Sequence, residues 1–231
     1  MKRSFIDAKI DEGIEFCRAQ NFHLPKWACW TPEDWACAGA EADEIRQREL
    51  GWDVTDFGSD DYANCGLLCF TIRNGILVDE PDAMIKDYCE KLLLVDENQY
   101  TPIHFHWHKM EDIINRGGGK LLIELWNADR DSEQLDEQSE VSVSIDGIRH
   151  QVAPGGTVAL KPGESITLEP YMYHTFYAEP DKGMVLGGEV SRVNDDTHDN
   201  RFLKPLPRFP AIDEDAPPRH LLCNEYSPAK A

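Results

Sequence analysis

Short apolar segments separated by glycine and proline follow one another from about Trp52 onward, and they constrain the fold of this chain more than any other feature. The segments are residues 66–75, 91–95, 101–107, 120–126, 141–145, 157–160, 165–168 and 184–190. Turn-forming pairs such as Asp146-Gly147 and Pro162-Gly163 lie between them. Many short strands joined by such turns are typical of an antiparallel barrel or sandwich, so we expect a mainly β protein.

The part of the chain before these segments, about residues 1–50, shows helical patterns instead. Apolar residues repeat there at helical spacing: Ile6, Ile10, Ile14 and Cys17. Ser4 is the candidate N-cap of this helix. A second helix is expected to begin at Pro32, because Thr31 is a favourable N-cap and proline is favourable at the first helical position.

The C-terminal part, about residues 203–231, contains five prolines between Pro205 and Pro218. Proline disrupts helices, so we expect an extended tail laid over the body of the protein. The acidic stretch 129–140 is expected to be a solvated loop. A length of 231 residues and a hydrophobic fraction of 41% suffice for one large core. We therefore interpret residues 1–231 as a single domain with a helical N-terminal extension and this tail.

The formal net charge of −20 excludes several classes of partner. Nucleic acids and anionic membranes would repel such a surface. No segment approaches the roughly 18 consecutive uncharged residues of a membrane span. Acidic residues appear before any apolar run at the N-terminus, so we expect no signal peptide. These patterns predict a cytoplasmic protein whose partner is a neutral small molecule.

The seven cysteines are odd in number, scattered and without a CxxC motif. Buried free thiols in a reducing compartment explain this pattern best. Cys65 and Cys69 come closest to the spacing of zinc ligands, but no second close pair completes a zinc finger.

Three histidines, a lysine and a glutamate lie close together in residues 104–111. On a strand, His104 and His106 would leave the same face. Glu111 can return to that face if the chain turns or bulges after His106. Two imidazoles and a carboxylate suit a divalent first-row metal with open positions. Such a turn would divert His108, which we interpret as a surface residue or a residue behind the ligands.

His174 is the candidate fourth ligand, because it lies where a returning strand could cross the histidine strand. The four residues then resemble the cupin pattern His-x-His-x4-Glu followed by a distant histidine. Gly117-Gly118-Gly119 also matches the first motif of that family, and Gly156 resembles the start of its second motif. The segment from Pro162-Gly163 to His174 is longer than the compact family form. The resemblance implies a cupin-type antiparallel β-barrel (jelly roll) with the N-terminal helices packed outside.

A narrower resemblance covers nearly the whole chain and is most specific in residues 102–119. The residues that carry it are 1–10, 21–30, 66–75, 102–119 and 188–202. They resemble the D-lyxose isomerase family of cupins, also described as D-lyxose/D-mannose isomerases. The resemblance implies a homodimer that interconverts aldoses and ketoses (D-lyxose with D-xylulose, D-mannose with D-fructose) with Mn²⁺, other divalent metals being possible.

The resemblance also implies roles for individual residues. His104, His106, Glu111 and His174 would bind the metal. Lys109 would contact the sugar, and Lys91 would be a further substrate contact. His104 and Glu111 would then face the substrate as well as the metal. At the rim, residues 194–196 and 199–201, Asp199 among them, are candidates for binding sugar hydroxyls, although Asp and Asn are also ordinary turn residues.

Aldose–ketose isomerisation needs a Lewis acid for the C1 and C2 oxygens and a base that carries a proton between C1 and C2. Lys109 can supply positive charge or a proton to the developing oxyanion. Glu189 is the first candidate base, because it ends an apolar strand after two glycines that permit close approach. Glu214 is the second candidate base, if the tail folds over the barrel mouth. A solvated acidic run would explain the presence of Glu214 equally well.

Two other classes use the same ligands. One is an iron-dependent cupin dioxygenase, which would hold oxygen in the open metal position. The other is a non-catalytic sugar-binding cupin. Lys109 and the spare carboxylates favour the isomerase, because proton transfer needs them and oxygen chemistry does not.

Overall fold

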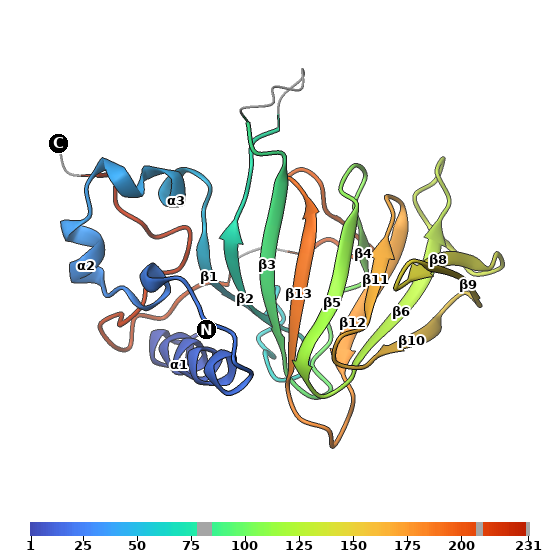
Figure 1. The fold of residues 1–231 in the computed structure, drawn as a ribbon, viewed down its shortest axis with the longest axis horizontal. Helices are drawn as coiled ribbons and strands as arrows, with labels where there is room; N and C mark the ends of the chain where they lie inside the picture. Colours follow the sequence, from blue (N-terminus) through green and yellow to red (C-terminus); the bar gives the residue numbers. More distant parts are fainter. Residues whose placement is uncertain (78–84, 207–209, 230–231) are drawn as a thin grey trace.

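A computed structural model describes residues 1–77, 85–206 and 210–229, and two curled antiparallel sheets dominate it (Figure 1). The expected mainly β architecture with helices outside is confirmed. Among the described residues, no helix is long and apolar enough to cross a membrane.

The larger sheet has eight strands in the order β1-β2-β3-β13-β5-β11-β8-β9. Their bounds are β1 Gly51–Thr55, β2 Leu67–Arg73, β3 Tyr88–Val95, β5 Glu111–Gly118, β8 Val141–Ile145, β9 Ile148–Val152, β11 Ser165–Leu168 and β13 Val185–Arg192. β13 lies between β3 and β5, although both precede it by a long stretch of chain. This placement brings a late strand into the middle of the sheet.

The smaller sheet runs β10-β6-β12-β4-β14, and β7 pairs with β6 beside this path. Its strands are β4 His104–Phe105, β6 Leu121–Ala128, β7 Leu135–Asp136, β10 Gly156–Leu160, β12 Met172–Ala178 and β14 Arg201–Phe202. β4 is shorter than the predicted strand 101–107, because the chain bends at Trp107 and His108. That bend supplies the turn that the return of Glu111 requires.

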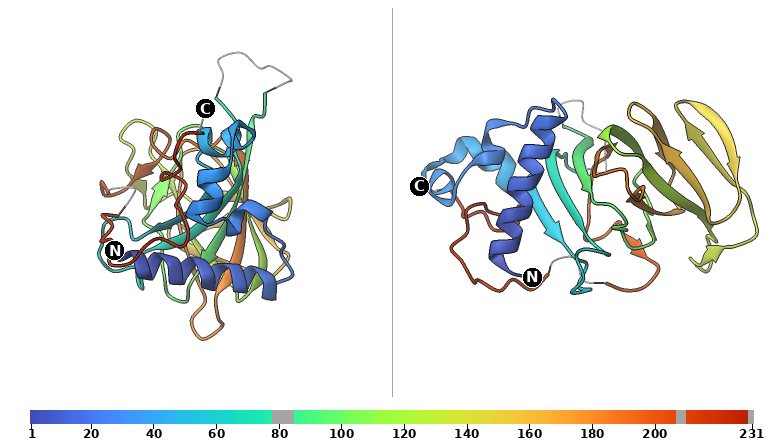
Figure 2. Two further views of the ribbon diagram at one scale, coloured as in Figure 1. Left: turned by 90° about the vertical axis from the view of Figure 1, so that its left-hand side faces the viewer. Right: turned by 90° about the horizontal axis from the view of Figure 1, so that it is seen from below.

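The helices lie together at one side of the larger sheet, next to β1 (Figures 1 and 2). They are α1 Arg3–Ala19, α2 Pro32–Cys37 and α3 Asp43–Gln47, with the 3-10 turns η1 Lys26–Cys29 and η2 Ala40–Ala42. Thr31 caps α2, as the sequence indicates, and it also forms a reciprocal capping box with Asp34. The predicted N-cap at Ser4 was wrong: α1 begins at Arg3, and the Ser4 hydroxyl donates to Asp215 instead.

Neighbouring residues of the central strands enter two different hydrophobic cores. Leu93 and Val95 of β3 belong to the core between the two sheets. Leu92 and Leu94 point to the other face, where Ile6 and Ile10 of α1 cover the sheet. Burial on both faces explains why this strand is continuously apolar and not alternating. The helices therefore bury the second face of β1 to β3.

The C-terminal segment runs back along the helical side of the molecule (Figure 2). Its described residues form no helix, and an isolated bridge joins Asp213 to Lys2. The Arg3 guanidinium, 2% exposed, pairs there with Glu214 and Glu225. The predicted extended conformation agrees with these contacts, while residues 207–209 and 230–231 lie outside the described part of the chain.

Candidate metal centre and active site

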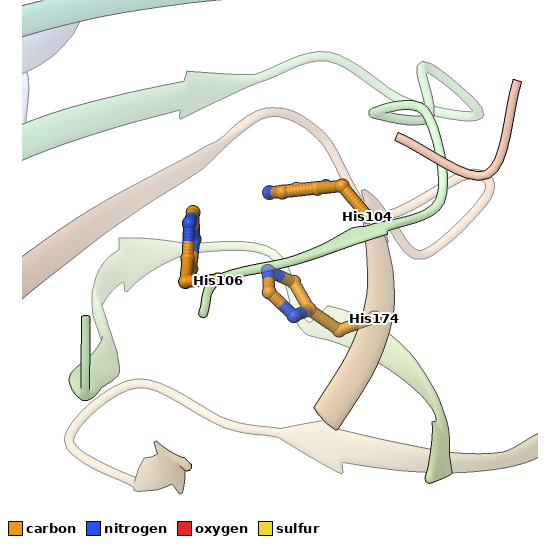
Figure 3. Close-up of side chains that lie close together, drawn as sticks. All are labelled: His104, His106 and His174. Atoms are coloured by element: carbon orange, nitrogen blue, oxygen red, sulfur yellow. The ribbon is translucent and has the colours of Figure 1, made fainter. Parts of the chain in front are cut away.

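Three histidines, from β4, from the residues that follow it and from β12, converge on one point (Figure 3). His104 of β4 is the direct cross-strand partner of His174 of β12. His106 follows β4 and turns its ring to the same point. One ring nitrogen from each histidine lies within 4.8 Å of the others, which is the spacing of a shared metal ion.

Backbone carbonyls hold each of these imidazoles in one tautomer. Nδ1 of His104 lies 2.7 Å from the Pro102 carbonyl, Nδ1 of His106 lies 2.7 Å from that of Asp199, and Nδ1 of His174 lies 3.0 Å from that of Met172. A neutral imidazole that donates from Nδ1 keeps its lone pair on Nε2. All three rings therefore present Nε2 to the centre.

The ring nitrogens are suited to bind a cation. Nε2 of His174 is buried and has no hydrogen-bond partner among the described residues. Burial, together with the neighbouring His174 and His106, holds the pKa of His104 well below its usual value, so this imidazole is neutral. A buried unpaired acceptor beside two further imidazoles fits a divalent metal.

Glu111, the first residue of β5, links the histidines to a lysine. Its Oε1 lies 3.5 Å from His106 Nε2 and 3.3 Å from His174 Nε2, and its Oε2 lies 2.7 Å from Lys109 Nζ. Burial opposes ionisation of this carboxyl, but the Lys109 ammonium outweighs it and holds the pKa well below its usual range. His108 is exposed, as the interpretation of the bend required.

Glu189 lies in β13 between two lysines. In the sheet it is the register partner of Lys91 in β3, and its Oε2 is 3.9 Å from Lys91 Nζ. Its Oε1 accepts a hydrogen bond from Lys109 Nζ at 3.0 Å. The pKa of Lys109 is raised, because Glu111, Glu189 and Asp196 outweigh the effect of burial. The pKa of Lys91 is raised as well, because Asp196 and Glu189 outweigh its burial. The side chain of Glu189 is thus flanked by two ammonium groups, one from its register partner Lys91 and one from Lys109.

These residues line one cavity between the sheets. Its polar lining includes Lys91, His104, His106, Lys109, Glu111, His174, Glu189, Asp196 and Asn200. Its apolar lining includes Leu67, Cys69, Leu93, Ile113 and Phe176. The polar side chains can bind hydroxyl oxygens and a metal, while the apolar side chains can contact carbon-bound hydrogens.

Comparison with known proteins adds to this geometry. The sequence model of a family described as D-lyxose isomerase matches residues 1–226. This chain belongs to the D-lyxose isomerase family. Proteins named D-lyxose/D-mannose isomerase from Escherichia coli O157:H7 and Serratia proteamaculans are each 48% identical to it, over 98% of both chains. The expected enzyme class, a sugar isomerase, is confirmed at the level of the family.

Solved structures share the fold of this D-lyxose isomerase family member. The L-ribose isomerase of Acinetobacter sp. DL28 gives a TM-score of 0.61 at 16% identity, covering 92% of this chain and 98% of that chain. The L-ribose isomerase of Cellulomonas parahominis gives 0.60 at 19% identity, with the same coverage. At such identities the likeness concerns the fold alone.

Two residues predicted for the site lie elsewhere in this family member. The carboxylate of Asp199 accepts the backbone N–H groups of His108 at 2.9 Å and Lys109 at 2.8 Å, so it supports the bend and does not face the cavity. Glu214 pairs with Arg3 and is 57% exposed. The tail does not bring Glu214 to the cavity.

Sequence reasoning did not single out Phe57 and Phe202, which also line the cavity. Phe57 follows β1 and Phe202 ends β14, yet their ring centroids lie 6.1 Å apart. Phe202 is the cross-strand neighbour of His104. No local signal marks either residue, because the two aromatic rings meet only through the pairing of distant strands.

Proposed function

We propose that this protein is a metal-dependent aldose–ketose isomerase that interconverts D-lyxose with D-xylulose and D-mannose with D-fructose, with Mn²⁺ as the metal. The observation that carries the proposal is the convergence of three Nε2 atoms beside a carboxylate–ammonium chain. The curated relatives named D-lyxose/D-mannose isomerase support the choice of sugars.

In this proposal the metal ligands are His104, His106, Glu111 and His174. A metal held by these residues would supply Lewis-acid chemistry toward the two sugar oxygens. His104 and Glu111 also border the position of the substrate, because both line the cavity. Imidazole and carboxylate ligands are compatible with Mn²⁺ and with other first-row divalent ions.

We assign Glu189 as the base. It removes the C2 proton of the aldose and returns it to C1, while the hydroxyl proton moves from O2 to O1, so that the ketose forms without net loss of atoms. Lys109 places a positive charge beside the oxygens on which negative charge develops, and Lys91 lies on the other side of Glu189. Glu214 has no role in this scheme, since it is exposed beside Arg3.

The test is incubation of the Mn²⁺-loaded protein with D-lyxose, D-mannose and D-fructose, followed by chromatography of the sugars. We expect the matching ketose or aldose to accumulate to equilibrium. No conversion of any of the three sugars, with metal bound, would contradict the proposal. Uptake of oxygen with Fe²⁺ would support a dioxygenase, and sugar binding without conversion would support a binding protein.

We also propose that the enzyme is a cytoplasmic homodimer. The family resemblance supports the dimer, and the charge of −20 agrees with a neutral sugar as partner. Sedimentation analysis at several protein concentrations tests the dimer: a single species of monomer mass would contradict it.

A further inference from the structure

An asparagine lies behind the two lysines of the cavity. Oδ1 of Asn194 lies 2.6 Å from Lys91 Nζ and 3.3 Å from Lys109 Nζ. An ammonium group only donates hydrogen bonds, so the oxygen of the amide must face both lysines. Asn194 is not among the described residues that line the cavity, and it therefore acts on the lysines from outside.

A second asparagine holds the first one in place. Nδ2 of Asn74 donates to the backbone carbonyl of Asn194 at 2.9 Å, and the backbone N–H of Asn194 donates to Oδ1 of Asn74 at 2.9 Å. Asn74 directly follows β2, whereas Asn194 follows β13. This reciprocal pair ties the end of an early strand to the segment that carries the acceptor of the lysines.

The acceptor is neutral, and its neutrality has a chemical consequence. The lysines already face three carboxylates: Glu111, Glu189 and Asp196. A fourth carboxylate at this distance would attract both ammonium groups strongly in a buried site and reduce the positive potential at the sugar. An amide oxygen fixes the direction of each N–H without adding charge.

We propose that Asn194, held by Asn74, is a positioning residue that directs the Lys91 and Lys109 ammonium groups toward the carboxylates and the sugar. The inference rests on the proposed function, because it assigns Lys109 to the charge that develops during isomerisation. Neither asparagine is a catalytic residue in this account, since both act through the lysines.

Kinetics test the role of charge. Asn194→Asp preserves the shape of the side chain and its acceptor oxygen but adds a negative charge. We expect kcat to fall about tenfold or more, because the lysine charge matters most in the transition state. KM and the midpoint of thermal unfolding should change little. Asn74→Ala should lower kcat in the same direction. The double variant Asn74→Ala/Asn194→Ala should be no slower than Asn194→Ala, because both act through one chain of contacts.

Asn127→Ala is the matched control. Asn127 is also half-buried and donates from its side chain to a backbone carbonyl, that of Glu140 at 3.1 Å, away from the cavity. We expect its kcat to equal that of the wild type. Wild-type kcat in both Asn194→Asp and Asn194→Ala would overturn the proposal.

A crystallographic measurement separates this inference from the proposed function. In Asn194→Ala we expect Lys109 Nζ to leave hydrogen-bonding distance of Glu189 or to occupy two positions. If Nζ stays in place at full occupancy, the inference is overturned even where activity falls. If the wild type converts none of the sugars, the proposed function fails, while the position of Lys109 in the variants still decides the inference.

Discussion

A single carboxylate between two buried ammonium groups, Glu189, distinguishes the proton-transfer side of the cavity from its metal side. Its oxygens contact Lys91 and Lys109, and Ser191 Oγ donates to Oε1 at 2.9 Å. None of its contacts is a histidine of the cluster in the described residues. Metal binding and proton transfer are therefore separable by mutation.

We expect Glu189→Gln to retain Mn²⁺ and to lose at least about a hundredfold of kcat, because an amide cannot carry the C2 proton. Titration calorimetry with Mn²⁺ and the sugar assay measure the two properties. Glu124→Gln is a control, since this glutamate lies on β6 and accepts a hydrogen bond from Tyr177 away from the cavity. Full activity of Glu189→Gln would remove it as the base.

Asp199 supports the metal centre from behind, because its carbonyl holds His106 and its carboxylate holds the bend before Lys109. Asp199→Asn replaces one acceptor oxygen with an NH₂ group that opposes a backbone N–H. We expect Mn²⁺ affinity to fall about tenfold, in the range typical of residues behind metal ligands. Asp195→Asn is the matched control, since Asp195 accepts backbone N–H groups of the same segment at Thr197 and His198. Equal affinities of the two variants would contradict the assignment.

At the scale of elements, helix α1 anchors the C-terminal segment through Arg3. The guanidinium is buried, whereas its partners Glu214 and Glu225 are partly exposed. We expect Arg3→Met to lower the free energy of unfolding by about 1–3 kcal/mol, because two carboxylates lose their partner. Urea denaturation measures this change. Arg18→Met, which breaks an exposed pair with Glu15, should cost only about 0–0.5 kcal/mol.

Acid should weaken the same anchor. The hydrogen bond from Arg3 holds the pKa of Glu214 below its ordinary value of 4.5. A lowered pKa in the folded state means that the stabilisation is present above about pH 4.5 and is lost as the pH falls through the lowered value. The difference in unfolding free energy between wild type and Arg3→Met should therefore shrink in acid.

At the scale of the whole molecule, the fold buries most of the cysteine thiols. None of the seven cysteines forms a disulfide; Cys29 and Cys37 are exposed, and the other five are buried. Burial raises the pKa of Cys17 to about 11 and that of Cys89 to about 12, so these thiols stay protonated at neutral pH. We expect a thiol-reactive dye to label two cysteines quickly in the native protein and seven in denaturant. Rapid labelling that persists in Cys29→Ser/Cys37→Ser would contradict this distribution.

The features that the sequence alone determined depend on residues that are close together in the chain. The alternation of short apolar segments and turns predicted the β fold, since strand and turn preferences act over a few residues. The spacing of His104, His106 and Glu111 predicted a shared face, because a strand and one bend relate these positions. The N-cap at Thr31 was predicted from equally local features. Ser4 failed as an N-cap, because the C-terminal segment offered its hydroxyl a competing partner in Asp215.

Only the tertiary structure decided which distant residues reach the cavity. The pairing of β12 with β4 places His174 beside His104, and the insertion of β13 between β3 and β5 brings Glu189 to Lys91. The same structure keeps Glu214 outside. Strand order and register bring together residues that are far apart in the chain. They depend on burying the core between the sheets and the core under the helices at the same time. Short-range sequence patterns do not encode strand order or register. The hydrogen-bonded contact between Asn74 and Asn194 therefore could not be predicted from the sequence.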